Sequence, residues 1–210
     1  TLGQNIRALR VAGTFDDCQS MVKRAFLDPA LKEKQNLTSA NSINVARWLP
    51  QMLYYVKGFQ QLGPVREAPV FSVPSGNFGN ICAGMLAARM GLPVSHFVAA
   101  TNANDTVPRF MADGSYAPRP AVPTLSNAMD VADPSNFVRI RELFEDRFPD
   151  LASRLTAFSF DDSQTLQAIR SLLASYGYVA DPHGAIGYLR LEKYLEAAPK
   201  APGIFLETAH

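Results

Sequence analysis

The residues best suited to chemistry form one short loop in the middle of the chain. The loop combines two glycines with small polar side chains, and it consists of Ser75, Gly76, Asn77, Phe78, Gly79 and Asn80. An apolar run at residues 70–73 precedes the loop, and apolar residues recur at helical spacing after it. We therefore predict a strand, a tight loop and a helix in direct succession.

This arrangement can hold a phosphate group. The first N–H groups of a helix have no intrahelical partners and carry partial positive charge. Glycines allow the backbone to approach an anion closely. The loop has no lysine, so it does not match the P-loop of nucleotide-binding proteins. An ordinary connection between a strand and a helix is also short and rich in glycine, so the spacing alone leaves both interpretations open.

Two further polar segments could line a site. Asn41, Ser42 and Asn44 stand at the start of an expected helix, where they could either cap the helix or contact a polar ligand. Asn104 and Asp105 follow an expected strand at residues 94–100. Ligands of open α/β sheets bind beyond the carboxyl ends of the strands, so this second segment is a candidate wall of the site.

Isolated ionisable residues favour ordinary structural roles. His96 lies between apolar neighbours in a strand pattern, which is typical of a hydrogen-bonded core residue. Arg109 is interpreted as a solvated side chain, although it could meet an anion. His183 falls in the first turn of an expected helix, and both a helix-terminal role and a site role stay open for it.

The pattern of elements predicts an α/β fold in which a parallel sheet carries helices on both faces. The expected strands lie near residues 6–12, 70–73, 94–100 and 203–207. The expected helices span residues 15–26, 42–62 with a bend at Pro50, 80–90, 108–113, 134–148 with an end at Pro149, 161–176 and 182–195. The second of these helices is expected to bury Val45, Leu49, Met52, Leu53, Val56 and Phe59.

The composition is that of an ordinary globular domain, with 47% hydrophobic residues and a net charge of +1. No run of Lys or Arg suggests a nucleic-acid partner, and no apolar stretch is long enough to span a membrane. We also predict no metal site. Cys18 and Cys82 lie in helical patterns and are predicted to be reduced thiols of a cytoplasmic protein.

The two ends of the chain are unusual. There is no initiator methionine, and the last expected strand is followed by little more than Thr208. The carboxyl end of a strand is where an α/β fold builds its site. We therefore expect the chain to be an internal piece of a longer protein.

Seven segments together resemble the bacterial threonine synthase family, in the order in which that family carries them. They are GTFDDCQ, TSANSINVARWLPQ, VPSGNFGN, GLPVSHFVAATNANDTVPRF, TLSNAMDV, DPHGAIGY and FLETAH. The resemblance implies a pyridoxal-phosphate enzyme of fold type II, which is the fold of the tryptophan synthase β subunit. It also implies the conversion of O-phospho-L-homoserine and water to L-threonine and phosphate. Residues 1–210 would then be a fragment covering most of the large cofactor-binding domain, without the C-terminal end of that domain.

The resemblance implies roles for individual residues. The loop from Gly76 to Asn80 would cradle the cofactor phosphate, and Thr208 would hydrogen-bond the pyridine nitrogen. The segment with Asn41, Ser42 and Asn44 would lie near the site. The Schiff-base lysine of the family lies upstream, and the six lysines of this chain stand on polar helix faces or between helices. We therefore expect no catalytic residue in this chain, and no activity from the chain alone.

Two alternatives stay open. The chain could belong to another pyridoxal-phosphate lyase of fold type II, such as a dehydratase or a threonine-synthase-like phospho-lyase. It could also be a non-enzymatic α/β module that binds phosphate. In a fragment, apolar surface of the sheet would be exposed, so self-association of the chain is expected.

Overall fold

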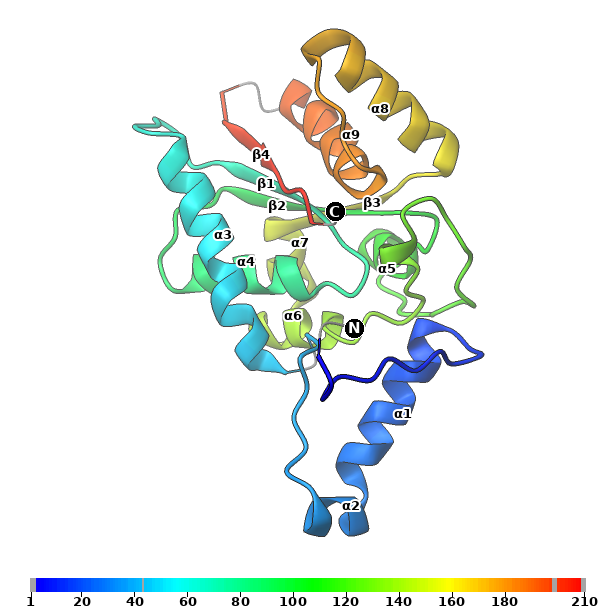
Figure 1. Cartoon of the computed structure of the whole chain (residues 1–210). Coiled ribbons are helices and arrows are strands. Elements are labelled where there is room, and N and C mark those ends of the chain that lie inside the picture. Colours follow the sequence, from blue (N-terminus) through cyan, green and yellow to red (C-terminus); the bar gives the residue numbers. More distant parts are fainter. Residues whose placement is uncertain (1–2, 43, 198–199, 209–210) are drawn as a thin grey trace. The chain divides into compact units, whose positions relative to one another are not determined.

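The computed structural model describes residues 3–42, 44–197 and 200–208, in two compact units formed by residues 1–38 and residues 39–210. The first unit contains α1 (Phe15–Leu27) and α2 (Pro29–Lys34), which contact each other (Figure 1). The predicted start of α1 is confirmed. The Thr14 hydroxyl accepts a hydrogen bond from the Asp17 backbone N–H, and the Asp17 carboxylate accepts one from the Thr14 backbone N–H.

The prediction of a strand near residues 6–12 is wrong. These residues form no strand, and the large apolar side chains Ile6, Leu9 and Val11 are all exposed. The apolar alternation already breaks between Ile6 and Leu9. A strand also needs a neighbouring strand to complete its backbone hydrogen bonds, and none of the described residues pairs with this segment.

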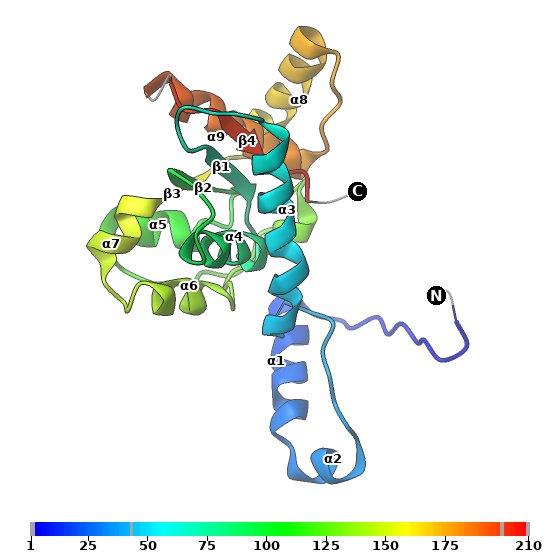
Figure 2. The ribbon, with the colours of Figure 1, turned by 90° about the vertical axis from the view of Figure 1, so that its left-hand side faces the viewer.

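The second unit is built on a parallel sheet of four strands in the order β3-β2-β1-β4 (Figure 2). The strands are β1 (Val70–Pro74), β2 (His96–Thr101), β3 (Leu155–Ser159) and β4 (Gly203–Phe205). The predicted α/β class is confirmed, as are the strands now labelled β1, β2 and β4. Strand β3, at one edge of the sheet, was not predicted.

Helices cover both faces of this sheet. The helical elements of the second unit are η1 (Val45–Arg47), α3 (Trp48–Gln61), α4 (Gly79–Arg89), α5 (Thr106–Asp113), η2 (Asn127–Met129), α6 (Phe137–Leu143), α7 (Phe148–Arg154), α8 (Asp162–Tyr176) and α9 (Pro182–Ala197). Helices α8 and α9 lie on one face, and α3, α4, α6 and α7 lie on the other (Figure 1).

Two prolines act differently from the sequence prediction. Pro50 does not bend a continuous helix, because the α-helix begins only at Trp48 after the 3-10 turn η1, so Pro50 stands in the first turn. Pro149 does not end a long helix, because α6 stops at Leu143 and Pro149 stands in the first turn of α7. Both positions suit proline, since N–H groups of a first helical turn have no intrahelical acceptor.

The buried face of α3 also differs from the prediction. Trp48, Met52 and Tyr55 are buried, whereas Val45, Leu49 and Leu53 are exposed. The difference follows from the later start of the helix and from the large aromatic side chains that it turns toward the sheet. The prediction is correct for Met52 and partly correct for Val56 and Phe59, which are half-buried, but apolar periodicity missed Trp48 and Tyr55.

An aromatic cluster connects α3 to the centre of the sheet. The Tyr55 ring packs against Phe71 of β1 and Phe97 of β2, with ring centroids 5.0 and 6.1 Å away, and all three side chains are almost fully buried. Gly84 of α4 faces the Tyr55 ring, and a Cβ atom at that position would overlap with the ring. The cluster therefore fixes α3 and α4 against the sheet.

His96 has the structural role expected from the sequence. Its Nε2 lies 3.3 Å from the Thr156 hydroxyl, and its ring stacks on Tyr194 with centroids 5.0 Å apart. Burial, the largest effect, lowers the pKa of His96 to about 4. The imidazole is therefore neutral in the core at neutral pH.

Truncation of Phe71 tests the importance of the aromatic cluster. Phe71 is completely buried, so we expect Phe71→Ala to lower the free energy of unfolding by about 3–5 kcal/mol, through lost burial and a new cavity. Urea unfolding measures the change. The control is Leu49→Ala on the exposed side of α3, for which we expect a change within about 0.5 kcal/mol. Equal losses in both variants would contradict the proposed position of the core.

Candidate functional site

The glycine-rich loop leaves the carboxyl end of β1 and enters α4 within four residues. The Ser75 backbone N–H donates to the Ala100 carbonyl, and its hydroxyl donates to the Val73 carbonyl, both over 2.8 Å. Phe78 precedes the first residue of α4 and adopts a left-handed conformation, with φ of 60°. The predicted succession of strand, loop and helix is confirmed, and the Ser75 side chain stabilises the strand end.

Both glycines of the loop stand where the chain has no room for a side chain. A Cβ atom at Gly76 would lie 2.6 Å from the Cα of Met129. A Cβ atom at Gly79 would lie 2.8 Å from the Cβ of Ser42. The loop is thus held between the segment around Met129 and the segment around Ser42, which are distant from it in sequence.

The first turn of α4 offers hydrogen-bond donors. Among the described residues no side chain caps this helix, and the residue before it, Phe78, has no polar side-chain group to do so. The N–H groups of a first helical turn have no acceptor inside the helix, and they carry partial positive charge. The start of α4 can therefore accept a negatively charged oxygen.

The two asparagines of the loop have their side-chain oxygens occupied by protein donors. The Asn77 Oδ1 accepts from the backbone N–H and the hydroxyl of Ser135, over 2.7 and 3.0 Å. The Asn80 Oδ1 accepts from the Tyr55 hydroxyl over 2.7 Å. The side-chain NH2 groups of the two asparagines are therefore the main groups available to a ligand. These groups are hydrogen-bond donors, which again favours an anionic ligand.

Ser42 joins the loop through hydrogen bonds that use the whole capacity of its hydroxyl. The group accepts from the side-chain amides of Asn77 and Asn136, over 3.2 and 2.9 Å, and it donates to Asn41 Oδ1 over 3.2 Å. A hydroxyl provides one donor and two acceptor sites. Ser42 therefore lies beside the loop, as expected, but it supports the loop and has no hydrogen-bonding capacity left for a ligand.

Asn44 favours the capping interpretation that the sequence left open. Its Oδ1 accepts from the Ala46 backbone N–H, and its Nδ2 donates to the Ser39 carbonyl. This is the arrangement of an N-cap residue, here for η1.

Asn104 and Asp105 serve the loop that follows β2. Asn104 exchanges hydrogen bonds with the backbone of Val122 in both directions, over 2.8 and 3.0 Å, and donates to Asn102 Oδ1. Asp105 pairs with Arg109 over 2.9 Å. Arg109 is therefore ion-paired, and both predicted wall residues are engaged with the protein.

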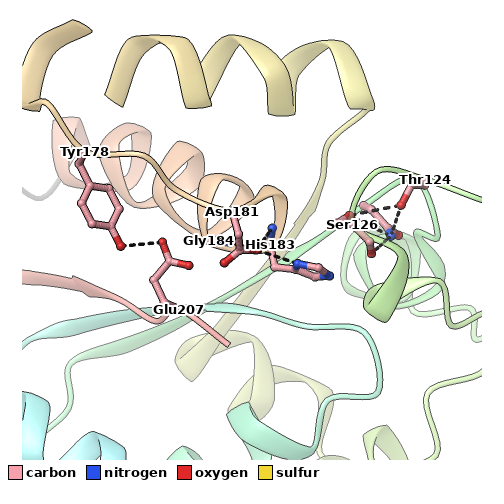
Figure 3. A network of polar contacts seen from close by, with 8 residues as sticks. Thr124, Ser126, Tyr178, Asp181, His183, Gly184 and Glu207 are labelled. Atoms are coloured by element: carbon pink, nitrogen blue, oxygen red, sulfur yellow. Dashed lines mark hydrogen bonds and ion pairs between the residues drawn. The ribbon is translucent and has the colours of Figure 1, made fainter. Parts of the chain in front are cut away.

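A second polar cluster lies at the carboxyl end of β4 (Figure 3). The Tyr178 hydroxyl donates to Glu207 over 2.9 Å, and Asp181 accepts from the backbone N–H and the Nδ1 of His183, over 2.6 and 2.7 Å. Any side chain at Gly184 would overlap with the Glu207 carboxyl group. The start of α9 is thus held against the end of β4, directly before the exposed Thr208.

The two carboxyl groups of this cluster titrate differently. Burial of the carboxyl group and its hydrogen bond with Asp181 raise the pKa of Glu207 to about 7, against the opposing effect of the Tyr178 hydroxyl. Burial alone would raise the pKa of Asp181 as well, but hydrogen bonds from Glu207 and from His183 outweigh it and lower that pKa. As the pH rises, Asp181 therefore loses its proton before Glu207 does, and the negative charge of the pair lies first on Asp181.

The loop and Thr208 lie at the same edge of the sheet. Strands β1 and β4 are parallel neighbours, with Ser72 opposite Phe205, and the Leu206 backbone N–H donates to the Ser72 carbonyl. Ser75 lies three residues after Ser72, and Thr208 lies three residues after Phe205. The structure thus brings the two predicted cofactor-contacting segments to one rim.

A comparison with protein families identifies the type of chain. The sequence profile described as "pyridoxal-phosphate dependent enzyme" matches residues 1–204. The chain belongs to the pyridoxal-phosphate dependent enzyme family.

The similar proteins compared below are all threonine synthases. The chain is 48% identical to the threonine synthase of Haemophilus influenzae, over all of its own length and 49% of that protein. The crystal structure of Escherichia coli threonine synthase superimposes with a TM-score of 0.93 at 48% identity, over 100% of this chain and 48% of the other. The pyridoxal-phosphate-bound threonine synthase of Brucella melitensis gives a TM-score of 0.84 at 36% identity, over 98% and 49%. The chain spans about half the length of these relatives.

Lysines, possible metal ligands and possible membrane-spanning helices can be examined in the described part of the chain. All six lysines are exposed. Residues 3–42, 44–197 and 200–208 hold no cluster of three or more His, Cys, Asp or Glu suited to a metal ion. Every helix in these ranges is too short or too polar to cross a membrane.

Sequence reasoning missed most of the residues that hold the loop from behind. Tyr55 was hidden in an apolar helix pattern, and Ser135, Asn136 and Arg139 had no visible link to the loop. Arg139 donates to the Ser42 carbonyl and to Asn136 Oδ1, each over 3.0 Å. The only available signal was the Asp-Pro-Ser-Asn sequence at residues 133–136, which is typical of a helix start.

The raised pKa of Glu207 predicts an unusual dependence of stability on pH. An acid whose pKa is higher in the folded state stabilises the protein fully below its ordinary pKa of 4.5 and stops doing so as the pH rises through about 7. Glu207→Gln removes this titration. We therefore expect the wild type to lose stability relative to the variant between pH values of about 5 and about 8, measured by urea unfolding.

The control for this experiment is Glu196→Gln, which changes an exposed glutamate near the end of α9. Its stability should follow that of the wild type across the pH range. Parallel pH profiles for wild type and Glu207→Gln would contradict the assigned environment of Glu207.

Proposed function

We propose that the loop from Gly76 to Asn80 binds the phosphate group of pyridoxal 5′-phosphate and that Thr208 faces the pyridine nitrogen of the cofactor. The residues present fit this group. The start of α4 supplies backbone N–H groups, the two glycines let the loop pack closely between the segments around Met129 and Ser42, and the loop amides present donors. A phosphate is an acceptor of many hydrogen bonds, so it matches a site that consists mainly of donors.

We further propose that the chain is part of a threonine synthase, a carbon–oxygen lyase acting on phosphates, with O-phospho-L-homoserine as substrate. Identity of 46–48% to curated threonine synthases, over the full length of this chain, carries the proposal. In the reaction, the bond from Cγ to the phosphate oxygen breaks and a bond from Cβ to a water oxygen forms. We assign the reaction to the cytoplasm, in line with the two free thiols Cys18 and Cys82.

The residues of this chain would bind and orient rather than transfer protons. The cofactor, when bound, supplies the electron sink that the reaction needs. The loop amides hold the phosphate end, and the neutral Thr208 hydroxyl leaves the pyridine nitrogen unprotonated, which moderates that sink. A Schiff-base lysine needs a shielded setting that lowers the pKa of its amine, and the exposure of all six lysines supports its position outside residues 1–210. These residues would then form most of the large cofactor-binding domain.

A titration with pyridoxal 5′-phosphate, followed by absorbance, tests the cofactor proposal. We expect saturable binding that inorganic phosphate competes away, and no stoichiometric lysine adduct in the intact mass after borohydride reduction. Asn80→Ala should weaken binding about tenfold, since one charge-assisted hydrogen bond is lost. Gln167→Ala, which removes an exposed amide on α8, is the control. Absence of binding, or one stoichiometric adduct on a single lysine, would contradict the proposal.

A segment exchange tests the proposed activity. The chain aligns with one continuous half of the Escherichia coli enzyme at 48% identity, so it can replace that half in a chimera. We expect the chimera to release phosphate from O-phospho-L-homoserine and to form threonine in equal amounts, whereas the 210-residue chain alone releases none. A folded chimera that binds the cofactor but forms no threonine would contradict the assignment.

We also propose that a second copy of this chain covers the free edge of β4. A mostly apolar groove of about 710 Å³ runs along this edge between α3 on one side and α8 and α9 on the other. Four tyrosines line it, and Tyr176 is 69% exposed. An edge strand beside exposed apolar surface is a site of association between chains.

Sedimentation velocity tests this association. We expect a dimer at micromolar concentration, and a shift to monomer in Tyr176→Glu, because a charge in the groove opposes burial. Lys193→Glu, an exposed charge change on α9 outside the groove, is the control. A wild type that stays monomeric at high concentration would overturn the proposed association.

A further inference from the structure

We propose that Tyr55 is a positioning residue for anion binding: its hydroxyl fixes the orientation of the Asn80 side-chain amide, so that the NH2 group faces the ligand and the oxygen faces the protein. This inference rests on the phosphate-binding function proposed above for the loop. It adds a residue that lies outside the loop, in the middle of α3, and that touches no ligand itself.

The contact between the two side chains is short and direct. The Tyr55 hydroxyl lies 2.7 Å from Asn80 Oδ1 and 3.0 Å from the Asn80 backbone carbonyl. A separation of about 2.7 Å is typical of an O–H group that donates to an oxygen, whereas N–H donors lie nearer to about 2.9 Å. The distance therefore favours the amide orientation in which the oxygen meets Tyr55.

The surroundings of the Tyr55 ring do not allow it to move away. The side chain is fully buried between Phe71 and Phe97, and the ring faces Gly84, where a single added Cβ atom would overlap with it. Burial, with a smaller contribution from Cys82, raises the pKa of Tyr55 well above its usual value. The hydroxyl thus keeps its proton and stays a donor at a fixed point behind Asn80.

The orientation of the Asn80 side-chain amide depends on the Tyr55 hydroxyl alone, whereas that of Asn77 is fixed by two donors. Asn77 Oδ1 is held by a backbone N–H of Ser135 in addition to the Ser135 hydroxyl. Within residues 3–42, 44–197 and 200–208, the Asn80 side chain has no hydrogen-bond partner other than Tyr55. Without Tyr55, the Asn80 amide could turn and present its oxygen to the anion, which would replace an attraction by a repulsion.

The decisive variant is Tyr55→Phe, which removes the hydroxyl and keeps the ring. The probes are pyridoxamine 5′-phosphate and pyridoxamine, because neither forms a Schiff base with the exposed lysines and only the first carries a phosphate. Binding of both to the full chain is measured by fluorescence. We expect Tyr55→Phe to weaken the phosphorylated probe about tenfold and to leave the affinity for pyridoxamine unchanged. Tyr54→Phe, the same change at the exposed neighbouring tyrosine, should alter neither affinity.

A double-mutant cycle with Asn80→Ala separates positioning from a general structural effect. If Tyr55 acts through the Asn80 amide, Tyr55→Phe should have no further effect once that amide is gone. Equal weakening of both probes by Tyr55→Phe, or an undiminished effect of Tyr55→Phe in the Asn80→Ala background, would overturn this inference alone. A wild-type chain that binds neither probe would overturn the proposed function and the inference together.

Discussion

The left-handed turn at Phe78 is the constraint on which the site depends. A residue with a side chain pays about 1–2 kcal/mol for this conformation, so something must hold it there. The Phe78 side chain is 3% exposed and packs edge-to-face on Phe137 of α6, with ring centroids 5.6 Å apart. Burial of an aromatic side chain contributes about 1.5–3 kcal/mol, which is enough to offset the turn. The turn starts α4 directly at the rim of the sheet, where the first N–H groups of the helix have no acceptor inside the helix.

A buried polar layer then fixes the loop from behind. Asn136 is fully buried, and its amide connects the Ser42 hydroxyl to the Asn77 carbonyl, while Arg139 holds its oxygen. In such a network each group depends on the others, because a buried donor or acceptor without a partner costs about 1–3 kcal/mol. The segments around Ser42, Asn77 and Asn136, which are far apart in sequence, therefore stabilise one another. The side-chain amides of the loop can thus be held in position before a ligand binds.

Local signals in the sequence were sufficient for the loop and for several helix ends. Asp161 and Gly177 bound α8 as predicted, because capping chemistry acts within one helical turn. Strand β3 was missed, the strand predicted near residues 6–12 was wrong, and the buried face of α3 was only partly right, since all three depend on which distant segment packs beside them. The same reason explains why Tyr55 and Asn136 were missed: their partners at the loop lie 25 and 59 residues away.

The two ends of the rim differ in electrostatic character, and this difference can orient a ligand. The β1 end presents uncapped N–H groups and amide donors, whereas the β4 end carries Asp181 and Glu207. A phosphate is attracted to the first end and repelled by the second. The high pKa of Glu207 limits that repulsion at neutral pH, because part of the population carries a proton there. This difference in charge supports the orientation proposed above, in which the phosphate lies at the β1 end of the rim and the ring nitrogen lies toward Thr208.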